Sequence, residues 1–142
     1  MDDKASRSSR EAESYGERSD SGGVLVVEDE ALIAMYVEDI VEQAGYGVAG
    51  VVSSLDDALT FLDDHTVDSA VLDVELNGRA VYPLADVLMS RRIPFVFASS
   101  YGERNIPEAY RSGPVVQKPF APSELRRALA KAGVPRQKKR AG

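Results

Sequence analysis

The chain has 142 residues, of which 44% are apolar, and a formal net charge of −6 at pH 7. This length and apolar content suffice for one domain with its own core. The chain has no cysteine, which excludes disulfide bonds and thiolate zinc sites. No apolar stretch approaches the length of a membrane span, and the acidic balance argues against nucleic acid as the main partner. We therefore expect a cytoplasmic protein that uses neither a membrane nor nucleic acid.

Charge and composition divide the chain into three parts. Residues 1–22 hold six acids and four bases but no aliphatic run, which predicts a disordered N-terminal tail. Residues 134–142 hold four bases and no acid, which predicts a basic C-terminal tail. Residues 23–133 carry a net charge of −8 and contain the recurring apolar runs. This middle part is the predicted folded domain.

Five apolar runs begin 22 to 24 residues apart: Val24–Val27, Val48–Val52, Ala70–Val74, Ile93–Ala98 and Val115–Gln117. That interval leaves room for one strand, one helix and two loops. The runs are continuous rather than alternating, which is typical of parallel strands covered on both faces. We predict a flavodoxin-like, doubly wound α/β domain with a five-stranded parallel sheet and five helices. Of the common strand orders, we expect 2-1-3-4-5.

The segments between the runs have the apolar period of helices. Four of the five predicted helices lie at 32–44, 54–62, 81–88 and 122–132. Ser54 fits a capping box, and Pro122 suits the first turn of a helix. The remaining helix, at 104–113, is predicted to be the least stable, because it is short and contains Pro107.

Acidic residues follow two of the apolar runs, and a lysine follows another. Glu28 and Asp29 come after the first run, Asp73 lies in the third, and Lys118 follows the fifth. In the order 2-1-3-4-5, strands one and three are neighbours, and ligands bind at the carboxyl edge of such sheets. Crowded carboxylates repel one another, so their pKa values would be raised unless a cation joined them. The pattern favours Mg²⁺ and phosphoryl chemistry, with Asp73 as the candidate nucleophile.

Each of these residues also has an ordinary structural explanation. Asp73 could open a turn, Glu28 and Asp29 could favour the dipole at a helix start, and Lys118 could be a solvated lysine. Their joint occurrence at three strand ends favours a site instead. In that site, Lys118 and Ser99 would contact the phosphoryl group.

The motifs VLVVEDE, AVLDV, FASS and QKPF stand in the order and spacing of bacterial response-regulator receiver domains, and the resemblance covers residues 23–133. The stretch PFVFASSYG is similar to the Phe-Ala-Thr-Gly-Tyr motif of stand-alone receivers found mainly in alphaproteobacteria. The resemblance implies that a histidine kinase or phosphotransfer protein phosphorylates Asp73. It also implies that Glu28, Asp29, Asp73 and the backbone carbonyl of Glu75 bind Mg²⁺.

The same resemblance implies that Ser99 is the switch hydroxyl and Lys118 the lysine of the family, but the chain departs from the family pattern. Glu28 replaces a commoner aspartate, and Ser99 replaces threonine. Val115 stands where most receivers have a tyrosine or phenylalanine, so we expect Tyr101 to take over the role of the aromatic switch. The Lys118-Pro119 bond is a place to suspect a cis peptide.

We expect a single-domain response regulator that signals through the face of its fourth strand, fourth helix and fifth strand, as a monomer or weak dimer. It is not expected to be an enzyme beyond catalysing its own phosphorylation and dephosphorylation. One alternative is a Mg²⁺-dependent phosphotransferase or hydrolase, because Glu28 with 73–75 is faintly similar to the acidic site of toprim nucleases. Another is a scaffold receiver without phosphorylation. The single histidine, His65, is expected to be exposed and not catalytic.

Overall fold

The computed structural model describes residues 22–111 and 113–136, so almost all of the predicted N-terminal tail lies outside the described residues. Five strands form a parallel sheet: β1 (Val24–Val27), β2 (Val48–Val52), β3 (Ser69–Asp73), β6 (Phe95–Ser99) and β7 (Val115–Gln117). Their order is β2-β1-β3-β6-β7, which is 2-1-3-4-5 when the strands of this sheet alone are counted. The labels differ from that count because a hairpin of β4 (Glu75–Leu76) and β5 (Arg79–Ala80) intervenes.

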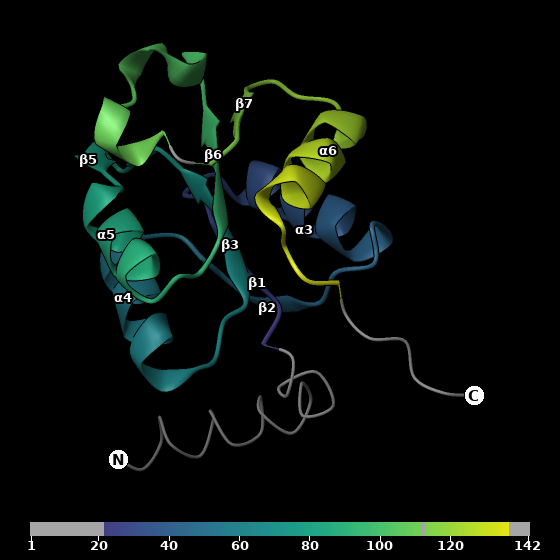
Figure 1. Ribbon diagram of the computed structural model, residues 1–142, viewed down its shortest axis with the longest axis horizontal. Helices are drawn as coiled ribbons and strands as arrows, with labels where there is room; N and C mark the ends of the chain where they lie inside the picture. The colour runs from purple at the N-terminus through teal and green to yellow at the C-terminus, as the bar shows by residue number, and fades with distance from the viewer. Residues whose placement is uncertain (1–21, 112, 137–142) are drawn as a thin grey trace.

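Helices cover both faces of the sheet (Figure 1). On one face lie α3 (Ala31–Gln43) and α6 (Pro122–Ala132), and on the other lie α4 (Leu55–Asp64) and α5 (Tyr82–Ser90). Each face of the sheet has its own hydrophobic core, and strand β1 contributes side chains to both. Val24 and Val26 pack with residues of α3 and α6, whereas Leu25 and Val27 pack with residues of α4 and α5. This double coverage explains why the strands are continuous apolar runs in the sequence.

The described residues contain four α-helices, so the predicted count of five is wrong. The segment predicted as the fourth helix forms two short 3₁₀ helices, η1 (Gly102–Asn105) and η2 (Glu108–Tyr110). Pro107 lies between them with φ −58° and ψ 147°, and a proline has no N–H for a continuous helix. The side chain of Ile106, 1% exposed, anchors the segment in the core.

Local signals explain several element boundaries. Asn77 and Gly78 adopt positive φ values of 51° and 80° in the two-residue turn between β4 and β5, and this residue pair is favoured in such turns. The sequence analysis did not predict this hairpin. The Ser54 hydroxyl accepts a hydrogen bond from the Asp57 N–H at 3.0 Å and caps α4, as its capping signal predicts. Pro122 is the first residue of α6.

The packed part of the chain extends beyond residue 133, the predicted end of the domain. Val134, which the sequence analysis places in the basic tail, is 7% exposed and belongs to the core beneath α3 and α6. The Arg136 guanidinium lies 5.2 Å from the centroid of the Tyr46 ring, which is a cation–π contact. Residues 137–142 lie outside the described part. Within the described ranges, no helix is long and apolar enough to span a bilayer.

Candidate functional site

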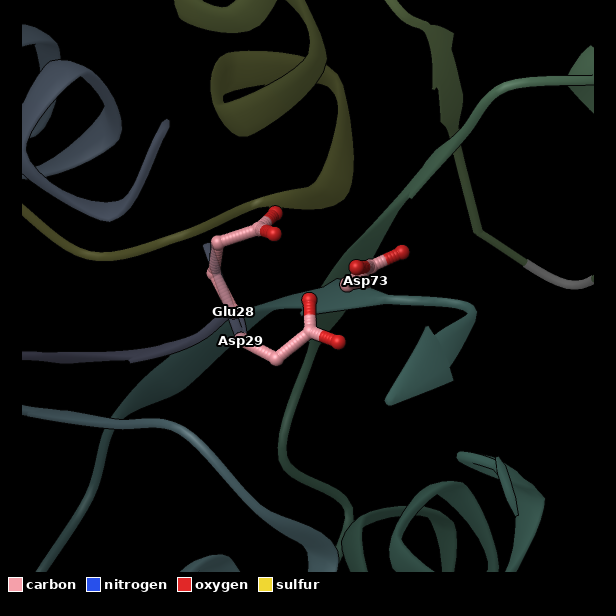
Figure 2. A group of neighbouring side chains, drawn as sticks. All are labelled: Glu28, Asp29 and Asp73. Atoms are coloured by element: carbon pink, nitrogen blue, oxygen red, sulfur yellow. The ribbon is translucent and has the colours of Figure 1, made fainter. Parts of the chain in front are cut away.

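Three carboxylates meet at the carboxyl edge of the sheet (Figure 2). Glu28 and Asp29 follow β1, Asp73 ends β3, and these two strands are paired in parallel. One oxygen of each carboxylate lies within 4.8 Å of the other two. The structure therefore brings together the three side chains that the sequence predicts as metal ligands. A cluster of carboxylate oxygens is a donor set that suits Mg²⁺.

Backbone N–H groups orient each carboxylate. The donors are those of Glu30 to Glu28 (3.1 Å), Asn77 to Asp29 (2.8 Å) and Glu75 to Asp73 (3.3 Å). The donor to Asp29 belongs to the β4–β5 turn. The side-chain amide of Asn77 also donates, to the Ser53 carbonyl at 3.4 Å. The unpredicted hairpin thus helps to shape the acidic site.

Lys118 follows the edge strand β7, and its side chain reaches both Glu28 and Asp73. Its Nζ lies 2.9 Å from Glu28 Oε1 and 3.3 Å from Asp73 Oδ2. Its backbone N–H donates to the Ser99 carbonyl at 2.9 Å, which extends the β6–β7 pairing to the lysine. The side chains of Glu28, Asp73 and Lys118 are 4%, 12% and 15% exposed, so solvent screens these charges weakly.

The ionisation of the site is dominated by burial. Burial raises the pKa of Glu28 to about 7, although the hydrogen bonds from Lys118 and the Glu30 N–H oppose it. Burial also raises the pKa of Asp73 against the opposing charge of Lys118. Burial lowers the pKa of Lys118, but the hydrogen bond to Glu28 and the charge of Asp73 outweigh it and the net shift is upward. Repulsion between carboxylates, the cause that the sequence analysis proposes, is therefore a smaller contribution than burial.

Ser99 lies at the carboxyl end of β6, beside Asp73. It is 3% exposed, and its hydroxyl accepts a hydrogen bond from the Tyr101 N–H at 3.0 Å. The Tyr101 side chain is 60% exposed. The Lys118-Pro119 peptide bond is cis, which confirms the suspicion from the sequence.

A cleft of about 950 Å³ opens above this edge of the sheet. Six of the predicted site residues line it: Asp29, Asp73, Glu75, Ser99, Tyr101 and Lys118. Glu28, the seventh predicted site residue, is buried beside the cleft, where it contacts Lys118. His65 is exposed at the end of α4, where its ring stacks on Phe61 with centroids 4.0 Å apart.

Tyr36 also lines the cleft, although it was not among the predicted site residues. It is 41% exposed, and its hydroxyl donates to the Phe120 carbonyl at 2.7 Å. The signal in the sequence was the residue type, because a tyrosine in an otherwise aliphatic stripe carries a polar group that needs a partner.

The sequence profile of the response regulator receiver domain matches residues 24–130. The chain therefore belongs to this family, as its motifs predict. Receiver domains are generally signalling modules rather than enzymes, they interact with histidine kinases or phosphotransfer proteins, and they bind Mg²⁺ in an acidic pocket.

Three relatives illustrate the match. The solution structure of SdrG from Sphingomonas melonis Fr1, an alphaproteobacterial receiver, is 39% identical with a TM-score of 0.71 and covers 80% of this chain and 97% of SdrG. The chemotaxis protein CheY of Thermotoga maritima is 30% identical and covers 76% of this chain and 94% of CheY. The transcriptional regulatory protein PdtaR of Mycobacterium tuberculosis is 30% identical and covers 72% of this chain and 52% of PdtaR. The chain thus spans about half the length of that relative.

Proposed function

We propose that this receiver domain accepts a phosphoryl group on Asp73 from a histidine kinase or phosphotransfer protein, with Mg²⁺ as cofactor. The observation that carries the proposal is the position of the Asp73 carboxylate, which clusters with Glu28 and Asp29 and lies 3.3 Å from Lys118 Nζ. An Asp73 oxygen would attack the phosphorus of a phosphohistidine. The P–N bond breaks, an acyl phosphate forms, and the imidazole leaves and takes up a proton.

The acids and the lysine would divide the charge of the transferred group between them. Asp29 and Asp73, with Glu28 directly or through water and the backbone carbonyl of Glu75, would hold Mg²⁺. When bound, the metal neutralises charge on the phosphoryl oxygens. Lys118 would exchange part of its contact with Asp73 for a phosphoryl oxygen, and the Ser99 hydroxyl would donate to another. The same residues would support self-catalysed phosphorylation and dephosphorylation.

The response would pass through Ser99 to Tyr101. In the structure, the hydrogen bond from the Tyr101 N–H to the Ser99 hydroxyl holds the start of the η1–η2 segment. Rotation of this hydroxyl toward a phosphoryl oxygen would break that hydrogen bond. Because Val115 is not aromatic, the exposed Tyr101 ring would report the switch. We propose that β6, η1, η2 and β7 form the face that contacts a downstream protein, with the chain acting as a monomer or weak dimer in the cytoplasm.

Phosphoryl incorporation tests this function. Incubation with Mg²⁺ and acetyl phosphate should add one phosphoryl group to the intact mass of the wild type, and Asp73→Asn should abolish the addition. Asp64→Asn, which removes an exposed acid near the end of α4, is the matched control and should be modified normally. Beryllofluoride with Mg²⁺ should shift the NMR signals of residues 99–111. A wild type that gains no mass from acetyl phosphate or from a phosphorylated histidine kinase would contradict the proposal.

The two alternative functions give different results. If the protein were a scaffold receiver, the wild type and Asp73→Asn would bind the partner with the same affinity. A hydrolase would release phosphate from esters over many turnovers in a metal-dependent reaction, without retaining a phosphoryl group on the protein.

A further inference from the structure

The turn that carries Lys118 has few polar anchors. The Lys118 N–H donates to the Ser99 carbonyl at 2.9 Å, and the Ala121 N–H donates to Glu124 at 2.7 Å. Pro119, between them, has no N–H to donate. In the middle of the turn, the Phe120 carbonyl accepts a hydrogen bond from outside the turn.

Tyr36 of α3 holds that carbonyl. Its hydroxyl donates to Phe120 O at 2.7 Å, the one hydrogen bond within the described ranges that joins this turn to α3. The Tyr36 and Phe120 rings also pack with centroids 5.8 Å apart, and Phe120 is 7% exposed in the core beneath α3 and α6.

The contact between Tyr36 and Phe120 joins the segment that follows the acids to the segment that follows Lys118. Helix α3 begins two residues after Asp29, so Tyr36 moves with the element that follows the acids. Phe120 lies two residues after Lys118. The hydrogen bond therefore ties the acidic side of the cleft to the lysine side, across 84 residues of chain.

We propose that Tyr36 is a positioning residue for Lys118, and that its hydroxyl sets where the ammonium stands relative to the Asp73 carboxylate. This inference rests on the proposed phosphoryl transfer to Asp73. Electrostatic stabilisation of a transferring group depends on donors that are already in place. A turn that loses its central anchor lets Lys118 sample positions away from the reacting oxygens, which slows transfer.

The test is Tyr36→Phe, which keeps the ring packing and removes the hydroxyl. The rate of phosphorylation by acetyl phosphate and the affinity for beryllofluoride in Mg²⁺ are each expected to fall about threefold to tenfold, the cost of one hydrogen bond. Mg²⁺ affinity should stay close to wild type, since the metal ligands are unchanged, and the melting temperature should fall by no more than a few degrees. Tyr46→Phe is the matched control: Tyr46 is buried, and among the described residues its hydroxyl makes no hydrogen bond.

A double-mutant cycle separates positioning from general damage. If Tyr36 acts through Lys118, Tyr36→Phe combined with Lys118→Met should be no slower than Lys118→Met alone. A wild-type rate in Tyr36→Phe, or a loss that adds in full to that of Lys118→Met, would overturn the inference. If the wild type gains no phosphoryl group, the proposed function fails and this inference fails with it. If the wild type is phosphorylated and Tyr36→Phe matches it, the inference alone fails.

Discussion

The two sides of the cleft are held by different kinds of structure. Glu28, Asp29 and Asp73 follow two central strands, and a backbone N–H fixes each carboxylate. The connection between β6 and β7, the strands that lead to Ser99 and Lys118, instead contains two short 3₁₀ helices. Such helices have poorer hydrogen-bond geometry and few buried contacts, so they open at low cost. The difference indicates a more rigid acidic side and a side that opens more easily, which the proposed function would use to respond to phosphorylation.

Truncation of one buried residue on each side gives the largest expected effect. Leu72→Ala in β3 should cost about 3 kcal/mol of unfolding free energy, because Leu72 is fully buried between the central strands and α5. Ile106→Ala should cost less in global stability, since its segment opens locally, and should speed amide exchange of residues 102–111. Urea unfolding and native-state hydrogen exchange measure both. Equal global losses without local exchange would remove the distinction.

The ionisation of Glu28 gives the next largest effect. Its folded pKa is about 7, above the ordinary value of 4.5, so between these pH values the folded state binds more protons than the unfolded state. The contribution of Glu28 to stability without metal is therefore present below pH 4.5 and lost as the pH rises through 7. Because Mg²⁺ needs the deprotonated carboxylate, its affinity should rise through the same window, by at most about tenfold per pH unit for one group.

Calorimetric titration of Mg²⁺ at several pH values, with urea unfolding in parallel, measures this dependence. Glu28→Gln should weaken the pH dependence of both profiles, with the remainder due to Asp73, whereas Asp64→Asn should leave them unchanged. A Mg²⁺ affinity that is independent of pH in the wild type would show that Glu28 is already ionised in the acidic site.

Substitutions of two buried serines, one at each end of the sheet, are expected to have effects of about 1 kcal/mol. The Ser69 hydroxyl, at the start of β3, is fully buried and has no hydrogen-bond partner within the described ranges, so Ser69→Ala should stabilise the fold by about 1 kcal/mol. Ser99→Ala, at the end of β6, removes the acceptor of the Tyr101 N–H and should speed exchange at residues 101–106. Urea midpoints and exchange rates compare them. Destabilisation by Ser69→Ala would indicate a bound water at that hydroxyl.

The smallest expected effect lies at the outer end of the movable side. Tyr110 stacks on Tyr82 with centroids 4.6 Å apart, and its hydroxyl donates to Asp86 of α5 at 2.8 Å. Tyr110→Phe should cost less than about 0.5 kcal/mol in global stability, since the contact is exposed, and should roughly double exchange of residues 102–111. Unchanged exchange would show that Ile106 alone holds the segment.

The elements with strong local signals were predictable. The runs Val24–Val27, Val48–Val52 and Val115–Gln117 are strands with those bounds. In the central strand Val24–Val27, burial of every residue requires an unbroken apolar run. The segment 104–113 misled the prediction, since its apolar residues have helical spacing while Pro107 interrupts the hydrogen bonding. The β4–β5 hairpin was missed because its strands are two residues long and show no periodicity.

The candidate site was predictable in its members but not in its contacts. Glu28, Asp29, Asp73 and Lys118 could be chosen because parallel strands place their carboxyl ends at one edge. The ion pairs of Lys118 depend on the path of a turn, and no pattern along the chain specifies that path.

The sequence by itself determined the class of fold, the strands and the acids and lysine that follow them, because hydrophobic period and residue chemistry act over a few neighbouring residues. Only the packed structure reveals that burial is the main cause of the raised pKa of Glu28, that the Asn77 N–H donates to Asp29, and that Tyr36 donates to Phe120. These properties depend on burial and distance between segments 48 to 90 residues apart, which are set when the elements pack.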